Sequence, residues 1–397
     1  MKNVIFISPN FPDTYWKFCR HLKENGMNVL GIGDAPYDAL SNELKDSLNE
    51  YYKVDSLEDY DQVYRGVAFL IFKYGPIDWL ESNNEYWLER DAMLRTAFHI
   101  TSGFQVEDMP RIKYKSRMKE YYAKAGIPTA RYYMVESEQG CRDFIRKVGW
   151  PVVAKPDNGV GANHTYKLAG EADLRIFLES RDPNIPYIME EFIHAEINSY
   201  DAIINSAGEP MFETGNVTLV SLMDVVNDNG NCAFYIQKEL PADIRKAGRA
   251  TVKSFGVKSR FVHLEFFRLT QDQEGLGKKG DIVALEVNMR PSGGISPDMM
   301  NFAHSTDVYK VWADMIAFDH STQEPGEHNF CVFAGRRDGK TFKLSHEALV
   351  EKYGPHLKLV GRVADALSGA MGNQMYIANF PTKREMERFL KDALGGK

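Results

Sequence analysis

The chain has 397 residues, of which 44% are hydrophobic and 26% charged, the composition of a globular protein with about two or three domains. Its formal net charge of −7 excludes a general nucleic-acid binder, although a local basic pocket could still hold a nucleotide. The four cysteines lie far apart without a CxxC pair, and no apolar run has the length of a signal-peptide core or a membrane span, so we expect a cytoplasmic protein with reduced thiols.

The first 108 residues alternate short apolar strands with helical segments. This alternation is typical of a doubly wound parallel sheet, with helices expected at 14–25, 41–49, 59–74 and 84–98 and strands at Val4–Ser8, Val29–Ile32, Tyr51–Val54 and Ile77–Leu80. No Gly-x-Gly-x-x-Gly follows the first strand, so NAD binding is not expected. The segment Ser82-Asn83-Asn84-Glu85 follows the fourth strand, where α/β sheets bind ligands, and it either contacts a substrate or caps a helix, the commoner role.

A basic helix and a glycine-containing loop follow a junction near Gly103–Pro110. The helix is expected at Ser116–Ala125, and the basic run that includes Lys115 is either a solvated face or a phosphate site. Further on, Lys155 ends an apolar strand and precedes a loop with Gly159 and Gly161. Flexible backbone N–H groups and a lysine could hold a polyphosphate, but a plain β-hairpin turn fits equally well.

Tyr187–Ile193 is an apolar strand that ends in Glu190, Glu191, Phe192 and Ile193. Such an end could offer backbone groups and an apolar wall to an adenine, or it could be a strand end with exposed acids. The acidic Glu196 follows closely.

The next segments are predicted as an irregular stretch, a strand and a helix. Phe212–Asp224, which contains Asn216, is polar and is expected to be irregular. Phe234–Leu240 reads as a strand that includes Lys238, and Pro241–Phe255 reads as a helix.

Asp281–Gly294 is the most informative stretch of the chain. Its apolar run is typical of a buried strand such as those of parallel sheets, yet it carries Glu286 and Asn288 on one face, with Arg290 next in that row. A buried carboxylate needs a cation, and two hard oxygen donors suit Mg²⁺. An exposed edge strand is the alternative.

A preceding strand at Phe261–Leu269 is expected to form a hairpin with this stretch. His263 and Glu265 share one of its faces, so the hairpin could bring Glu265 opposite Glu286. His263 is expected to be a satisfied core residue rather than a ligand. The last 77 residues show three strand candidates and an amphipathic helix at Lys383–Leu394, which suggests a small mixed cap.

The order of these motifs resembles the ATP-grasp superfamily, and within it the carboxylate–amine ligases related to biotin carboxylase, carbamoyl phosphate synthetase and D-alanine–D-alanine ligase. This resemblance implies an α/β and α+β protein in four parts: a parallel-sheet domain at 1–108, a small lobe at 109–187, a large lobe at 188–320 and a cap at 321–397. It implies Mg²⁺, or Mn²⁺, on Glu265, Glu286 and Asn288. It implies that ATP is held by Lys115, Lys155, Gly159, Gly161, Glu190, Glu191, Phe192, Ile193, Glu196 and Lys238.

The reaction implied by the resemblance is ATP-dependent activation of a small carboxylate, such as an amino acid or peptide, as an acyl phosphate, followed by coupling to an amine. Arg290 and Lys155 would stabilise the charge that develops. A small-molecule kinase and a non-catalytic nucleotide-binding protein are the alternatives. Besides these small molecules we expect no nucleic acid or membrane partner, while a homodimer is compatible with the resemblance. The candidate substrate contacts are Asn84, Asn216, Arg268, Ser292 and Gly293.

Overall fold

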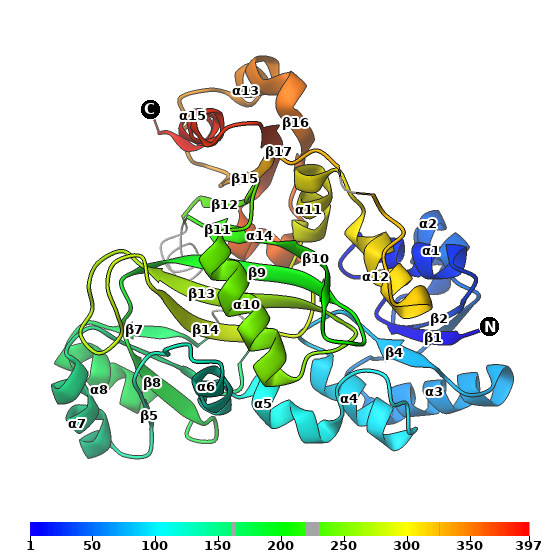
Figure 1. Cartoon of the computed structure of the whole chain (residues 1–397), viewed down its shortest axis with the longest axis horizontal. Helices are drawn as coiled ribbons and strands as arrows, with labels where there is room; N and C mark the ends of the chain where they lie inside the picture. Colours follow the sequence, from blue (N-terminus) through cyan, green and yellow to red (C-terminus); the bar gives the residue numbers. More distant parts are fainter. Residues whose placement is uncertain (160–163, 220–229, 325, 397) are drawn as a thin grey trace.

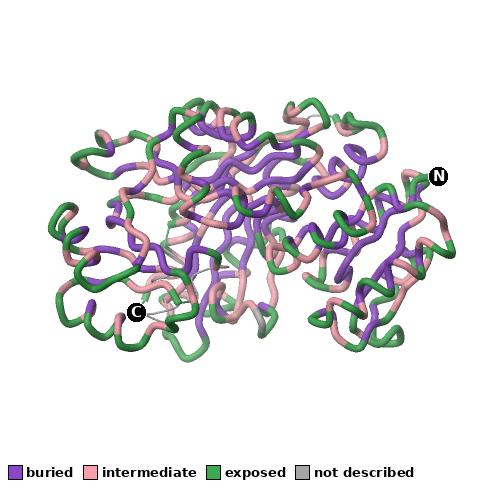
Figure 2. The backbone as a smooth tube through the Cα atoms, turned by 90° about the horizontal axis from the view of Figure 1, so that it is seen from below, coloured by how far each residue is buried: buried purple, intermediate pink, exposed green. Residues whose placement is uncertain are grey.

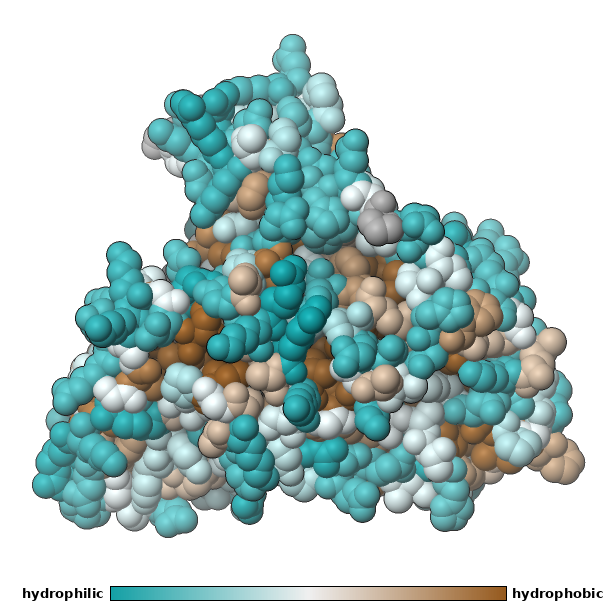
Figure 3. Space-filling model, in the orientation of Figure 1, coloured by the Kyte–Doolittle hydropathy of each residue, from teal (hydrophilic) through white to brown (hydrophobic). Residues whose placement is uncertain are grey.

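The computed structural model describes residues 1–159, 164–219, 230–324 and 326–396 of the chain. Its strands form three sheets, which are coloured blue to cyan, teal, and green to red along the chain in Figure 1. Buried segments follow the strands through the middle of the molecule, and exposed segments form the outer helices and loops (Figure 2). In the space-filling view apolar residues lie mainly in the recesses of a largely hydrophilic face (Figure 3). None of the described helices is long and apolar enough to cross a membrane.

The first sheet is parallel, with the strand order β3-β2-β1-β4, which confirms the predicted doubly wound arrangement. All five residues of β1 are buried, because helices cover both faces of the sheet. The elements are β1 (Asn3–Ile7), α1 (Trp16–Glu24), β2 (Asn28–Gly33), α2 (Asn42–Ser47), β3 (Glu50–Lys53), α3 (Tyr60–Tyr74), β4 (Trp79–Glu81) and α4 (Leu88–Ala97).

The second sheet is small and antiparallel, with the order β5-β8-β6-β7. Its apolar side chains pack against those of α7 and α8. The loop after Lys155 connects the antiparallel pair β6 and β7, so the predicted hairpin is present. The elements of this region are α5 (Met109–Lys113), α6 (Lys115–Lys124), β5 (Tyr132–Met134), α7 (Glu138–Val148), β6 (Val152–Pro156), β7 (Tyr166–Leu168), α8 (Glu171–Ser180) and β8 (Tyr187–Glu191).

The third and largest sheet has the order β14-β13-β9-β11-β12-β15-β17-β16, and β10 also pairs with β9. Helix α10 lies across it in Figure 1. Its strands are β9 (Ala195–Ile204), β10 (Pro210–Thr214), β11 (Asn216–Thr218), β12 (Cys232–Ile236), β13 (Arg260–Leu269), β14 (Ile282–Asn288), β15 (Phe330–Arg336), β16 (Leu357–Arg362) and β17 (Gln374–Phe380). The helices of this half are α10 (Ala242–Phe255), α11 (Ser296–His304), α12 (Val308–Phe318), α13 (His346–Tyr353), α14 (Asp365–Met371) and α15 (Lys383–Leu394).

Three local predictions are wrong. Part of the stretch expected to be irregular forms β10 and β11, because Phe212 and Val217 pack against apolar clusters and both strands pair with β9. The strand predicted over Phe234–Leu240 ends at Ile236, so Lys238 lies beyond it. Strand β14 is an antiparallel edge strand rather than a member of a parallel sheet.

Two buried contacts join the parallel sheet to the largest sheet and its helices. Phe18 of α1 packs its ring 5.0 Å from that of Trp312 on α12, in a shared apolar cluster. Arg260, at the start of β13, forms a 2.5 Å ion pair with Glu81 of β4 and donates a 2.9 Å hydrogen bond to the Met289 carbonyl. The contacts of Arg260 fix the end of β4 next to the end of β14.

Candidate active site

The hairpin of β13 and β14 places Glu265 directly opposite Glu286, as predicted. Asn288 pairs in register with His263, two residues along the same strands. Side chains of directly opposed residues lie roughly 5 Å apart at their Cβ atoms, close enough for both carboxylates to reach one cation. The register shifts just after Glu265, a bulge of the kind that re-aims side chains next to active sites.

His263 connects Glu265 to the interior of the sheet. Its Nδ1 lies 2.8 Å from Oδ1 of the fully buried Asp201, and its Nε2 lies 3.5 Å from Oε1 of Glu265. Burial opposes the charge, but Asp201 and Glu265 outweigh it and raise the pKa of His263 to about 9. Burial likewise opposes the Glu265 charge, but His263 and Arg290 lower the pKa of that carboxyl. Both groups are therefore charged at neutral pH, and the prediction of a satisfied histidine is confirmed.

Two lysines clamp Glu190 at the end of β8. Lys155 on β6 lies 2.7 Å and Lys119 on α6 lies 2.5 Å from its two carboxylate oxygens, and all three side chains are buried by about nine-tenths. Although burial alone would raise it, the two ammonium groups lower the pKa of Glu190 to about 2. Burial is also overcome at Lys155, whose pKa is raised by Glu190 and Glu286. This cluster is an ion network with two cations to one anion.

Lys115 brings the lysine cluster and the acidic hairpin together. Its Nζ lies 3.4 Å from Oε2 of Glu286 and donates a 3.1 Å hydrogen bond to the Gly159 carbonyl, in the loop that follows β6. The Lys115 backbone is held by the carbonyl of Asp157, whose carboxylate also accepts from Ser116. Residues predicted from three distant segments thus line one place between the small sheet and β14.

The backbone predicted to contact an adenine follows β8. Glu191 is buried, forms a bidentate pair with Arg131 and donates its N–H to the Arg131 carbonyl at 3.1 Å, so neither its side chain nor its N–H is left to contact a ligand. The Gln273 amide donates a 3.0 Å hydrogen bond to the Phe192 carbonyl. The N–H of Ile193 makes no hydrogen bond with the described part of the chain. These contacts leave that N–H available for an incoming acceptor.

Arg290 lies at the other end of the site, where β14 meets the parallel sheet. It donates a 3.3 Å hydrogen bond to Oδ1 of Asn288, and its Nε lies 3.5 Å from Oε2 of Glu85, in the loop after β4. Glu85 also forms a 2.8 Å ion pair with Lys113. The expectation that this loop contacts the site therefore concerns Glu85 more directly than Asn84.

Two predicted residues are not brought to this place. Arg268 binds the carboxylate of Asp243 at 2.6 and 3.0 Å, and it pairs with Ile282, roughly 13 Å along β14 from Glu286. Lys238 donates a 3.3 Å hydrogen bond to the Pro381 carbonyl.

The other predicted contacts have varied surroundings. Glu196 is exposed on β9, and Asn216 is buried with its backbone N–H donating to the Ser199 hydroxyl. Asn84 accepts from the Tyr86 N–H at 3.0 Å, a turn shortly before α4, in line with its alternative role near a helix start. After β14, Ser292 is buried and Gly293 is exposed, while Gly161 lies outside the described residues.

Arg131 has no role in the prediction, and Lys119 and Glu85 enter it only as members of the basic run and of the segment after the fourth strand. Lys119 follows Lys115 by one helical turn, so the i, i+4 spacing could have placed both on one face. The pairings of Glu85 and Arg131 carry no local signal, because their partners come from distant segments.

A magnesium ion suits the donors of the hairpin. Among the described residues no three His, Cys, Asp or Glu side chains are grouped to hold a metal ion by themselves. Glu265, Glu286 and Asn288 offer two carboxylates and a carboxamide. Mg²⁺ is commonly held by one or two carboxylates together with substrate phosphates, so this donor set fits a metal that arrives with a nucleotide.

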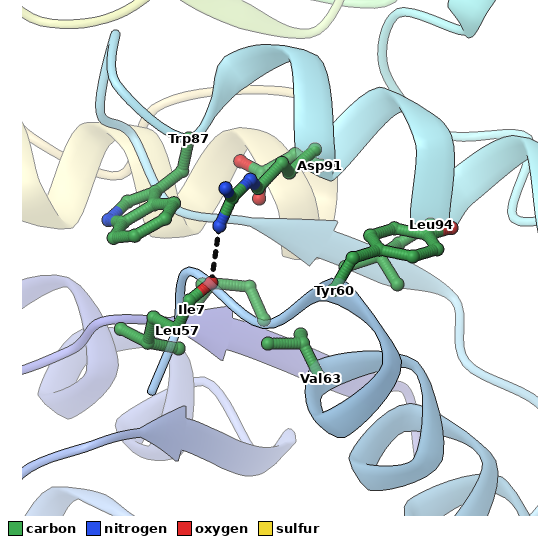
Figure 4. A pocket seen from close by; sticks show the side chains of 8 residues that line it. Ile7, Leu57, Tyr60, Val63, Trp87, Asp91 and Leu94 are labelled. Atoms are coloured by element: carbon green, nitrogen blue, oxygen red, sulfur yellow. Dashed lines mark hydrogen bonds between the residues drawn. The ribbon is translucent and has the colours of Figure 1, made fainter. Parts of the chain in front are cut away.

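A small apolar cavity lies elsewhere, in the parallel-sheet region between α3 and α4 (Figure 4). Its lining includes Ile7, Trp87 and Asp91, and Arg90 closes it by donating to the Leu57 carbonyl at 2.6 Å. The lining is apolar apart from the charged side chains, so the cavity is part of the core rather than of the candidate site.

Comparisons with known proteins support the same fold. No family model matches the sequence. The L-arginine-specific L-amino acid ligase of Bacillus subtilis is 25% identical over 303 residues, which are 74% of this chain and 70% of that protein. The crystal structure of an L-amino acid ligase from Bacillus licheniformis superposes with a TM-score of 0.70 and 14% identity, covering 99% of this chain and 97% of that one. The biotin carboxylase domain dimer of Hydrogenobacter thermophilus 2-oxoglutarate carboxylase, in complex with magnesium ADP and bicarbonate, gives a TM-score of 0.70 with 13% identity, covering 99% and 89%.

Proposed function

We infer that this chain, which has the ATP-grasp fold and is related to carboxylate–amine ligases, is an ATP-dependent ligase of that kind. The relatives and structural neighbours confirm the predicted resemblance and favour ligation over the kinase and non-catalytic alternatives. We propose that its acid substrate is a small carboxylate, an amino acid or peptide, and that an amine is the acceptor. ADP and phosphate are the other products.

The observation that carries this proposal is the meeting of the acidic hairpin with three lysines. Lys115 links Glu286 to the loop after β6, and Lys119 and Lys155 share a single carboxylate, Glu190. A triphosphate has several anionic oxygens for such lysines, and magnesium held with it would neutralise the carboxylates of the hairpin. The nucleotide therefore supplies negative charge to the lysines, and the metal supplies positive charge to the carboxylates of the hairpin.

The predicted residues that lie together suggest where the nucleotide binds. The triphosphate lies between Lys115, Lys155 and the loop that contains Gly159, and the adenine contacts the carbonyl of Glu191 and the N–H of Ile193. Magnesium on Glu265, Glu286 and Asn288 supplies electrostatic stabilisation of the phosphates when bound. Mn²⁺ has the same hard-oxygen preference and could replace it.

The chemistry needs no side-chain nucleophile. A substrate carboxylate oxygen attacks the γ-phosphorus, the bond from that phosphorus to ADP breaks, and an acyl phosphate forms. The amine nitrogen then attacks the acyl carbon, phosphate leaves, and the nitrogen loses a proton. Arg290 and Lys155 hold the negative charge that develops on the transferring group, a preorganised electrostatic role.

Hydroxylamine trapping tests this proposal. The chain is incubated with ATP, Mg²⁺, hydroxylamine and a panel of amino acids and other small acids, and hydroxamate and ADP are measured. We expect both products in equal amounts with at least one acid. ADP accompanied by a stable phosphorylated product instead would identify a kinase, and tight ATP binding without turnover on any acid would identify a non-catalytic protein.

We further propose a cytoplasmic location and a homodimer. All four cysteines are unpaired and buried, as expected for a reducing compartment. The biotin carboxylase domain of similar fold is a dimer. Light scattering on the purified chain tests the second point, and a mass of 45.2 kDa would refute it.

A further inference from the structure

Three charged side chains form a buried row between the parallel sheet and the end of β14. Glu85 lies between Lys113 at 2.8 Å and Arg290 at 3.5 Å. The side chains of Lys113, Glu85 and Arg290 are only 6%, 12% and 17% exposed. Buried ion rows of this kind are weak contributors to stability, because desolvation offsets most of their attraction. The row therefore calls for a reason other than stability.

The contact between Glu85 and Arg290 is incomplete. At 3.5 Å it is an ion pair without a hydrogen bond, and Oε2 of Glu85 is buried without any hydrogen-bond partner in the described part of the chain. Nδ2 of the buried Asn83 also has no partner there. A buried polar atom without a partner is destabilising, because it has lost its hydrogen bonds to water without replacement. An acceptor of Glu85 and a donor of Asn83, two residues apart in the segment after β4, are thus both left without a partner.

The sheet places these atoms where a ligand is expected. Strands β1 and β4 pair in parallel with Phe6 opposite Glu81, so Ser8 and Asn83 leave the same edge at the same level. The order β3-β2-β1-β4 reverses between these two strands, and open α/β sheets bind ligands at such a point. Ser8 and Asn83 both have left-handed backbone conformations, with φ of 54° and 53°, and such strain clusters at functional sites.

This place adjoins the proposed acyl-phosphate site. Arg290 contacts both Asn288 of the acidic hairpin and Glu85 of the loop after β4. A substrate carboxylate bound by Arg290 would take the guanidinium away from Glu85. The carboxylate of Glu85 would then face the substrate with an unpaired oxygen.

We propose that Glu85 selects acids that carry an ammonium group beside the carboxylate, so that the zwitterion replaces the Glu85–Arg290 contact. The carboxylate of the substrate pairs with Arg290, and its ammonium group donates to Oε2 of Glu85. Lys113 keeps the other oxygen of Glu85 in place. This inference rests on the proposed ligase function and assigns the acid substrate to the class of free α-amino acids.

Calorimetry provides the first test, because it needs no turnover. Binding of L-alanine, L-leucine and L-phenylalanine is compared with that of propionate, 4-methylpentanoate and 3-phenylpropionate, in the presence of Mg²⁺ and a non-hydrolysable ATP analogue. We expect at least one amino acid to bind at least about 30-fold more tightly than its des-amino partner, since a site built for a polar group strongly rejects an analogue without it. Equal binding of each pair to the natural chain would overturn the proposal.

The Glu85→Gln variant provides the second test. We expect the preference for the amino acid over its des-amino partner to fall by at least about tenfold, whereas Glu85→Asp retains part of it. A merely structural role of Glu85 would weaken both ligands together and leave their ratio unchanged, which would contradict the proposal. Glu89→Gln, a substitution on the exposed side of α4, is the matched control. If binding behaves as expected but no hydroxamate forms with any acid, the ligase proposal fails and the assignment of Glu85 stands.

Discussion

Glu190→Gln is expected to destabilise the chain by about 3 kcal/mol at pH 7. The carboxylate lies 2.5 and 2.7 Å from two buried ammonium groups, and the substitution leaves both without their charged partner. Lowering the pKa from 4.5 to about 2 corresponds to about 3 kcal/mol, at ~1.4 kcal/mol for each pKa unit. Removal of one member of a buried ion pair independently suggests about 3–5 kcal/mol.

Urea unfolding followed by circular dichroism measures this effect. Because the folded-state pKa is depressed, the stabilisation is present above pH 4.5 and is lost as the pH falls toward 2, so the natural chain should lose stability across this window and the variant should lose less. Glu138→Gln, which removes an exposed partner of Arg142, is the control and should change stability by less than about 0.5 kcal/mol. A loss below about 1 kcal/mol for Glu190→Gln would refute the clamp as a stabilising network.

Magnesium–ATP offers a further check on the same variant. If the lysines bind phosphates, the nucleotide supplies the anion that the variant lacks, and at the same nucleotide concentration it should stabilise Glu190→Gln by at least as much as the natural chain. Ligand at about 100 times its Kd stabilises by about 2.7 kcal/mol. A variant that gains clearly less stability than the natural chain at the same concentration would contradict this role of the lysines.

Three other predictions follow from the fold and the site. Glu286→Gln should lower turnover at least about 100-fold while circular dichroism stays unchanged, and an unaltered rate would remove Glu286 from the metal site. Burial and the nearby Glu81 raise the pKa of Asp91 to about 7, so stability should fall as the pH rises from about 4 to 7, and Asp91→Asn should flatten this slope in urea titrations at several pH values. Phe18→Ala should cost about 3–5 kcal/mol in the same assay, because it empties a fully buried aromatic contact with Trp312; a loss below 1 kcal/mol would contradict this packing.

The sequence predicts the hairpin well because its signals are local. The spacing of Glu286 and Asn288 by two residues sets their common face, and the glycine-containing turn sets the register that brings Glu265 opposite. The position of β14 in its sheet was harder to predict. An apolar run is expected both in a buried parallel strand and in an edge strand that another segment covers. Here the segment at Pro128 covers the edge, because the Ala284 N–H donates to the Pro128 carbonyl.

The ion pairs of the candidate site could not be predicted, because they join residues that are far apart in the sequence. Nothing near Glu190 in the sequence indicates Lys119, which is about 70 residues away, and nothing near Arg290 indicates Glu85. Lys238 is a related case, because a family resemblance predicts it near the phosphates while its ammonium group donates to the carbonyl of the distant Pro381. Ion pairs between distant segments depend on the packing of whole elements, which no short window of sequence contains.

The buried pair of Arg260 and Glu81 limits how this chain can be recombined. Arg260 belongs to a strand that carries a predicted metal ligand, yet its counter-charge comes from the fourth strand of the parallel sheet. A chimera in which another sequence replaces the parallel-sheet region would leave a buried guanidinium without its acid unless the new sequence supplies a carboxylate at the same strand end. The parallel-sheet region is therefore not freely exchangeable, because the electrostatic balance of the neighbouring sheet depends on it.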